Sequence, residues 1–216
     1  GTSACVITTN GIGAKLISSI VGLSGGVTII AMFLTMLTCI VLGMGVPTTA
    51  NYVIMATTCA PILIKMGLAP LAAHMFVFYF GIVADITPPV ALAAYAGSAI
   101  AKSRPMKTAV TATTLAIAAF IVPYCFGLNP ALLFIDATIL GSIQVIVTAL
   151  LGVFGVAAGL RGYIFSNLRV WQRLVVIAGG LVLVYPGTLT DIIGIVLVIG
   201  ICALSKMGGK KKAAEA

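Results

Sequence analysis

Two interrupted apolar segments, VLGMGVPTTANYV at residues 41–53 and GIVADITPPVALAAY at residues 81–95, decide the fold of this chain. Each segment is broken in its middle by Gly, Pro or Thr residues, which free backbone carbonyl and amide groups from helical hydrogen bonds. At membrane depth such groups are tolerated only where they are buried in protein or line a polar cavity. Paired interruptions of this kind indicate the ion and substrate site of a secondary transporter.

The composition places the chain in a membrane. Of its 216 residues, 61% are hydrophobic and 7% are charged, and the mean hydropathy is +1.24. Soluble domains carry about 25% charged residues, so this supply cannot build a soluble surface. The apolar runs do not alternate with polar residues as the strands of a membrane β-barrel do. We therefore expect an all-α integral membrane protein.

The net charge of +8 does not indicate nucleic-acid binding, because the cations flank the apolar spans. They form three clusters, at residues 102–107, 161–173 and 206–212. The positive-inside rule places all three clusters in the cytoplasm. Lys15 and Lys65 then lie on the outer side, and the segment between them enters the membrane from outside.

We expect three parts. Residues 1–130 form half of a transport domain, residues 131–205 form accessory transmembrane helices, and residues 206–216 form a disordered basic tail. The apolar start at residues 1–9 is typical of the end of a membrane helix, which indicates a fragment of a longer polypeptide or one part of an assembly.

Within the first part we expect a re-entrant helical hairpin at residues 27–64, a discontinuous transmembrane helix at 69–101 and a further span at 108–126. The apolar residues 27–42 extend about 24 Å at ~1.5 Å per residue, which falls short of a ~30 Å hydrocarbon core. Two complete crossings are the alternative for residues 27–64.

The first interruption offers oxygen ligands without carboxylates. Gly43 and Gly45 can turn their carbonyls outward, and Pro47 deprives the Gly43 carbonyl of its helical donor. Such oxygens suit a weakly held monovalent cation. The side chains of Thr48, Thr49 and Asn51 add further oxygens, and we predict that these three residues bind the substrate. A helix that starts near Thr48 suits a substrate carboxylate. The alternative is a plain helix–turn–helix with Thr48 as the N-cap.

The second interruption carries Asp85, the one acidic residue among residues 1–135, and Thr87. We predict that both belong to the substrate region and that Thr87 also serves a cation. An ionisable group within a membrane segment indicates function, so Asp85 is a candidate to bind a cation, carry a proton or pair with His74 or a lysine. The alternative is a solvated or capping Asp85 near the membrane interface.

Catalysis has no visible machinery in the sequence. The five cysteines show no CxxC and no metal spacing, His74 is the sole histidine, and there is no Walker loop. We predict that the chain is not an enzyme and holds no organic cofactor.

The stretches GMGVPTTANYVIMATTCAPIL at 43–63 and GIVADITPPVALAAYAGSAIA at 81–101 resemble the large membrane subunit of TRAP transporters, specifically the C-terminal half of the fused TAXI-type permeases. The resemblance covers residues 1 to about 130, and residues 131–216 resemble the extra C-terminal helices of the TAXI permeases more weakly. It implies the second half of an inverted-repeat, elevator-type symporter in a bacterial or archaeal cytoplasmic membrane.

By this resemblance the transporter takes an organic anion from a periplasmic binding protein and uses a sodium gradient, with proton coupling as the alternative. Gly43, Gly45 and Pro47 would supply backbone oxygens for one sodium ion, and Thr87 would serve a second ion or the substrate. The implied partners are the N-terminal half of the permease, a small membrane subunit, membrane lipid and the binding protein.

Two other functions stay open from the residues alone. One is a channel or another ion-coupled carrier built on broken helices. The other is a membrane-embedded enzyme or assembly factor, for which Asp85 and His74 are the available polar pair.

Overall fold

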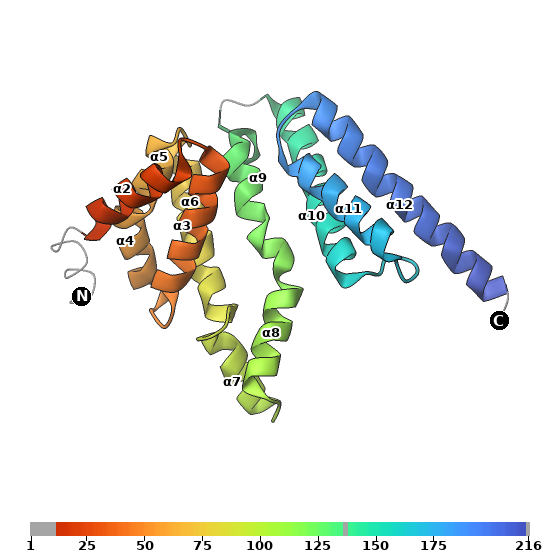
Figure 1. Ribbon diagram of the computed structural model, residues 1–216, viewed down its shortest axis with the longest axis horizontal. Coiled ribbons are helices and arrows are strands. Elements are labelled where there is room, and N and C mark those ends of the chain that lie inside the picture. The colour runs from red at the N-terminus through yellow and green to blue at the C-terminus, as the bar shows by residue number, and fades with distance from the viewer. Residues whose placement is uncertain (1–11, 136–137, 215–216) are drawn as a thin grey trace. The chain divides into compact units, whose positions relative to one another are not determined.

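The structure is a computed structural model that describes residues 12–135 and 138–214 (Figure 1). Within these ranges the regular structure is helical, apart from one isolated β-bridge between Tyr163 and Asn167. Two of the helices, α10 (Ile139–Arg161) and α12 (Thr188–Ala214, apolar over Thr188–Lys206), are long and apolar enough to cross a membrane. The expected all-α membrane architecture agrees with these helices. Residues 1–9, for which we expected the end of a membrane helix, lie outside the described ranges.

The chain divides into two compact units, residues 1–127 and 128–216. In the first unit, α6 packs against α3, α4 and α5, and α7 packs against α8. Its elements are α2 (Ile12–Ser24), α3 (Thr28–Gly43), α4 (Thr48–Thr58), α5 (Ala60–Lys65), α6 (Pro70–Val83), the 3-10 helix η1 (Ala84–Ile86), α7 (Leu92–Ile100), α8 (Pro105–Leu115), the 3-10 helix η2 (Ile117–Phe120) and α9 (Val122–Leu128).

Aromatic side chains of α6 form the centre of this unit. Phe76 and Phe80 are fully buried, and their ring centroids lie 4.8 Å apart. The Tyr124 ring of α9 meets both rings edge-on, at 5.4 and 6.1 Å. Edge-to-face aromatic pairs of this kind add to the stabilisation from area burial. The aromatic cluster therefore stabilises α6 in the turns that directly precede its break.

The stretch at residues 69–101 is divided as the sequence predicts. α6 ends at Val83, η1 follows, Thr87 is extended, and α7 begins at Leu92. Pro88 and Pro89 explain the break, because proline lacks a backbone donor and disfavours a helical residue before it.

The stretch at residues 108–126 differs from the single straight span that we expected. It consists of α8, η2 and the start of α9. Pro123 has no N–H for the carbonyl of Ala119, so the regular helix cannot pass through this point. Just before Pro123 the chain forms a 3-10 turn, in which the Ala119 amide donates to the Ala116 carbonyl at 2.8 Å.

The second unit contains the short 3-10 helix η3 (Pro130–Leu133) and the helices α10, α11 (Val170–Val184) and α12, with α11 in contact with both α10 and α12. Its buried apolar core includes Val176, Leu183 and Val198. Glycines allow the backbones to approach closely, as is usual between membrane helices. A Cβ atom added to Gly180 would lie 2.6 Å from the Gly152 carbonyl oxygen.

Helix α12 continues to Ala214, across residues 206–214 for which we expected a disordered basic tail. Extension of an existing helix requires no new nucleation, and Lys and Ala both favour helix. The lysines 210–212 therefore continue the helix in this structure.

Arg173 of α11 caps the C-terminal end of α10. Its Nε donates to the Gly159 carbonyl at 2.9 Å, and its Nη2 donates to the Leu160 carbonyl at 2.8 Å. The last carbonyls of a helix lack intrahelical partners, so this side chain supplies both the donors and a favourable charge. Arg173→Met, which keeps an apolar stem, is expected to lower the free energy of unfolding by about 1.5–3 kcal/mol.

The measurement is denaturant unfolding of the purified permease in detergent. The control is Arg161→Met, which removes an exposed arginine from the same helix end. Equal stability of the two variants would show that the Arg173 cap contributes nothing.

Candidate functional site

The first interruption forms a tight tip between α3 and α4. α3 ends at Gly43, and α4 begins at Thr48. Gly45 has φ +74°, a left-handed conformation that side chains other than glycine rarely adopt. Pro47 occupies the N-cap position, so the alternative in which Thr48 caps the helix is wrong. The tip therefore follows directly from the spacing of Gly45 and Pro47.

The carbonyls at the second interruption are largely engaged by neighbouring groups. The Thr87 hydroxyl donates to the Val83 carbonyl at 2.7 Å, and the Thr87 amide donates to the Ala84 carbonyl at 3.2 Å. Thr113 of α8 donates its hydroxyl to the Ile86 carbonyl at 2.9 Å. The Tyr95 hydroxyl of α7 donates to the Pro89 carbonyl. The break is thus held open by side chains of its own segment and of α8.

The two interruptions lie against each other. A Cβ atom on Gly43 would lie 2.8 Å from the Cβ of Ala84 and 3.3 Å from the carbonyl oxygen of Gly81. A Cβ atom on Gly45 would lie 3.9 Å from the Cγ1 of Val90, beyond the double proline. The tip of the α3–α4 hairpin therefore contacts the broken end of α6, and only a residue without a side chain fits at Gly43.

Asn51 links α4 to α6 at the same place. Its side chain is 1% exposed, and its Nδ2 donates to the Gly81 carbonyl at 3.1 Å. Its Oδ1 has no hydrogen-bond partner among the described residues. A buried amide oxygen without a partner costs about 1–3 kcal/mol, so this atom has unused capacity to bind a donor or a cation.

The other predicted site residues lie closer to the surface. Pro47, Thr48 and Thr49 are exposed at the start of α4, and Asp85 and Thr87 are half-buried at the break. His74 is paired with Tyr52, whose hydroxyl lies 3.1 Å from its Nδ1. In the structure the described partner of the imidazole is thus Tyr52 of α4, and the pairing of Asp85 with His74 stays a prediction.

Sequence reasoning missed Gly81 and Ala84, which bring the two interruptions together, and Thr113, which binds the second interruption. Small residues at 81 and 84 face Gly43, so the small-residue spacing along α6 was the available signal. Thr113 carried no signal, because its contact with Ile86 joins residues 27 positions apart.

The donors near the two interruptions are backbone, hydroxyl and amide oxygens together with one carboxylate. Among the described residues, no group of three His, Cys, Asp or Glu side chains is placed to hold a metal ion. Hard oxygen donors of low charge suit an alkali cation better than a transition metal.

No curated protein and no solved structure matches this chain. One protein family matches it, described as the DctM component of the tripartite ATP-independent periplasmic transporter, over residues 1–140. The match covers nearly two thirds of the chain and includes both interruptions. Membership implies a periplasmic binding protein and other subunits of the transporter as partners, and the family is one of transporter components rather than enzymes. The chain therefore belongs to the DctM family of TRAP transporters and is part of the membrane-embedded component of a secondary transporter.

Proposed function

We propose that this chain supplies the C-terminal half of the transport site in a fused TAXI-type permease that couples the uptake of an organic anion to a sodium gradient. The contact between Gly43 and the break at Gly81–Ala84 carries the proposal, because it brings the two interruptions of the backbone to one place. An N-terminal half with its own hairpin and broken helix would complete the site as an inverted repeat.

Helix lengths support a re-entrant hairpin for residues 27–64. α3 has 16 residues, α4 has 11 and α5 has 6. Cys59 alone separates α4 from α5, so the second arm runs from Thr48 to Lys65. A complete crossing needs about 20 residues, so α3 falls clearly short of the hydrocarbon thickness and the second arm slightly short of it. The tip would then lie at membrane depth, where its non-helical backbone must face protein or a polar cavity.

We assign the cation site to the backbone oxygens of Gly43, Gly45 and Pro47 together with Thr87. The Gly43, Pro47 and Thr87 carbonyls already accept the amides of Val46, Asn51 and Ala91, at 3.4, 2.9 and 3.2 Å, so a cation would use the second lone pair of these oxygens. The partnerless Oδ1 of buried Asn51 is a further oxygen that suits a hard cation, while the Asn51 Nδ2 keeps α4 attached to Gly81. Sodium bound here would stabilise the contact between tip and break, and substrate binding would depend on it.

The substrate carboxylate lies at the start of α4. Thr48 and Thr49 are exposed in the first turn of this helix, where free amides and the helix dipole favour an anion. Asp85 is half-buried in η1, at the break itself. Its proposed role is to select against a second negative charge, or to carry a proton if the coupling ion is a proton. The anion arrives from the periplasmic binding protein, and the small membrane subunit, separate or fused, supports the moving half.

The test is sodium-dependent uptake by the full permease in proteoliposomes, with its binding protein and the anion that this protein carries. Thr87→Val keeps the shape of the side chain but removes the hydroxyl, and we expect it to raise the sodium concentration for half-maximal uptake at least tenfold. The same shift should appear in sodium-dependent thermal stabilisation of the permease in detergent.

The matched control is Thr57→Val. Thr57 also donates its hydroxyl to the carbonyl four residues earlier, at 3.1 Å, but it lies away from the tip and the break. Uptake that is indifferent to sodium would overturn the coupling proposal. If uptake then follows a pH gradient and Asp85→Asn abolishes it, the coupling ion is a proton.

A further inference from the structure

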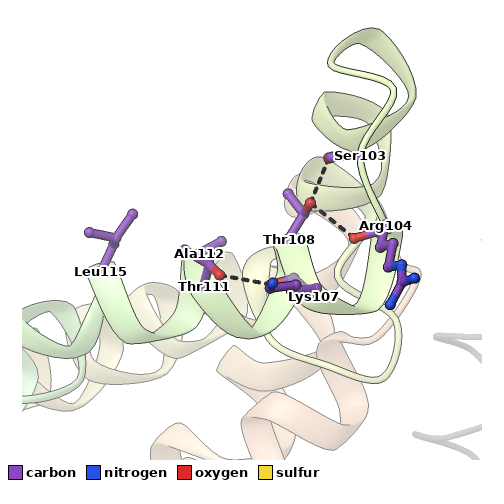
Figure 2. A pocket seen from close by; sticks show the side chains of 7 residues that line it. All are labelled: Ser103, Arg104, Lys107, Thr108, Thr111, Ala112 and Leu115. Carbon is purple, nitrogen blue, oxygen red and sulfur yellow. Dashed lines mark hydrogen bonds between the residues drawn. The ribbon is translucent and has the colours of Figure 1, made fainter.

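A basic pocket lies on the exposed side of α8, apart from the contact between tip and break. Its volume is about 540 Å³. Figure 2 shows its side chains in a row along α8, with Arg104 near one end and Leu115 at the other. The lining residues are Ser103, Arg104, Lys107, Thr108, Thr111, Ala112 and Leu115.

The turn between α7 and α8 sets the basic end of this row. Lys102 has φ +49°, and its amide donates to the Ala99 carbonyl at 3.4 Å. The Ser103 amide donates to the Ser98 carbonyl at 3.0 Å, which completes a Schellman ending for α7. This geometry stops α7 sharply and places Arg104 directly before the first turn of α8.

The first turn of α8 has unused donors for an anion. Its N-cap is Arg104, which makes no side-chain cap, and no acidic residue lies in the first turn. Pro105 has no N–H, so the amides of Met106 and Lys107 are the free donors at this helix start. The Ser103 and Thr108 hydroxyls are 2.8 Å apart and lie beside them. Two cationic residues, the free amides and the hydroxyl pair of Ser103 and Thr108 thus lie at the same end of the pocket.

Polarity changes along the pocket. Arg104 and Lys107 lie at the helix start, and Thr111 directs its hydroxyl to the Lys107 carbonyl at 2.8 Å, which leaves its methyl group for the pocket. Ala112 and the exposed Leu115 follow at the apolar end. A soluble anion would contact only the basic end of the pocket. A lipid would contact both ends, because it has a charged head and an apolar chain.

We propose that this pocket binds an anionic phospholipid. The phosphate lies between Arg104, Lys107 and the first turn of α8, and one acyl chain follows the helix across Thr111 and Ala112 to Leu115. Asp85 is the only acidic residue among residues 1–135 and does not line the pocket, so no acidic side chain of the lining neutralises the two cations. Basic clusters at the cytoplasmic ends of membrane helices face the anionic leaflet, where this lipid is available.

The experiment measures lipid binding by native mass spectrometry of the full permease in detergent. The probes are 1-palmitoyl-2-oleoyl phosphatidylglycerol, the matching phosphatidylcholine and inorganic phosphate. We expect the phosphatidylglycerol to bind at least tenfold more tightly than the phosphatidylcholine. The double variant Arg104→Gln/Lys107→Gln should remove this preference, and Leu115→Asn should weaken the binding of the lipid without affecting inorganic phosphate.

The matched control is Arg161→Gln/Lys206→Gln, which removes one exposed arginine and one exposed lysine from another part of the chain. The same loss in this control would show that bulk charge, not the pocket, attracts the lipid, and would overturn the proposal. Inorganic phosphate that competes fully with the phosphatidylglycerol would assign the pocket to a soluble anion instead. A photo-crosslinker at residue 115 that captures another segment of the transporter rather than lipid would also overturn it.

Discussion

Gly43→Val is expected to reduce sodium-driven uptake more than tenfold while the permease still inserts into the membrane. The valine Cβ would lie 2.8 Å from both the Ala84 Cβ and the Asn51 Nδ2. The Ala84 Cβ moves only with its backbone, so the tip must withdraw from the break. Overpacking of this kind costs about 1–3 kcal/mol, and every 1.4 kcal/mol is a factor of about ten in an equilibrium.

The measurement is initial uptake at saturating substrate, normalised to the amount of permease in the membrane. Gly97→Val is the control, because Gly97 lies in α7 of the same unit and an added Cβ would meet nothing within 4 Å. Gly43→Ala should give an intermediate loss, since it adds the clashing Cβ but no further methyl groups. Normal uptake by Gly43→Val would mean that the contact between tip and break is not part of the transport cycle.

Gly180→Leu is expected to give the largest loss of stability in the second unit. A Cβ at this position would lie 2.6 Å from the Gly152 carbonyl oxygen, 2.9 Å from the Val156 amide nitrogen and 2.8 Å from the Val156 Cγ2. Two of these neighbours are backbone atoms, so α10 and α11 must move apart as whole helices. We expect a loss of about 3 kcal/mol in the free energy of unfolding, the upper part of the usual range for overpacking.

This loss is measured by denaturant unfolding of the purified permease, with the proteolytic cleavage of the second unit as the signal of its unfolding. The control is Gly200→Leu in α12, where an added Cβ would meet nothing within 4 Å. If both variants have the same midpoint, the close approach of α10 and α11 does not contribute to stability.

Several features could be read from the chain because their causes are local. Gly45 and Pro47 predict a tip between two helices, and Pro88 and Pro89 predict the end of α6, since both effects act within a few residues. The length and apolar character of α10 likewise predict a membrane span. Pro123 offered the same kind of local signal for the division of residues 108–126, but the continuous hydrophobicity there favoured a single span.

Other features depend on contacts between distant residues. Asn51 looked like a substrate ligand from its position beside Thr48 and Thr49, yet its amide nitrogen is bound to Gly81, 30 positions later. His74 looked available to Asp85, yet it is paired with Tyr52. Neither partner can be deduced from spacing, because helix packing decides which faces of α4 and α6 meet.

The amino-acid sequence by itself determined that this is a helical membrane protein and where its backbone is interrupted. Hydrophobicity, glycine and proline act through the solvent and through single dihedral angles, so these properties need no knowledge of neighbours. Only the tertiary structure decided that Gly43 lies against Ala84 and Gly81, and that the Asn51 amide binds the Gly81 carbonyl. The physical reason is that close approach and side-chain pairing depend on how whole helices pack, which no short stretch of the chain specifies.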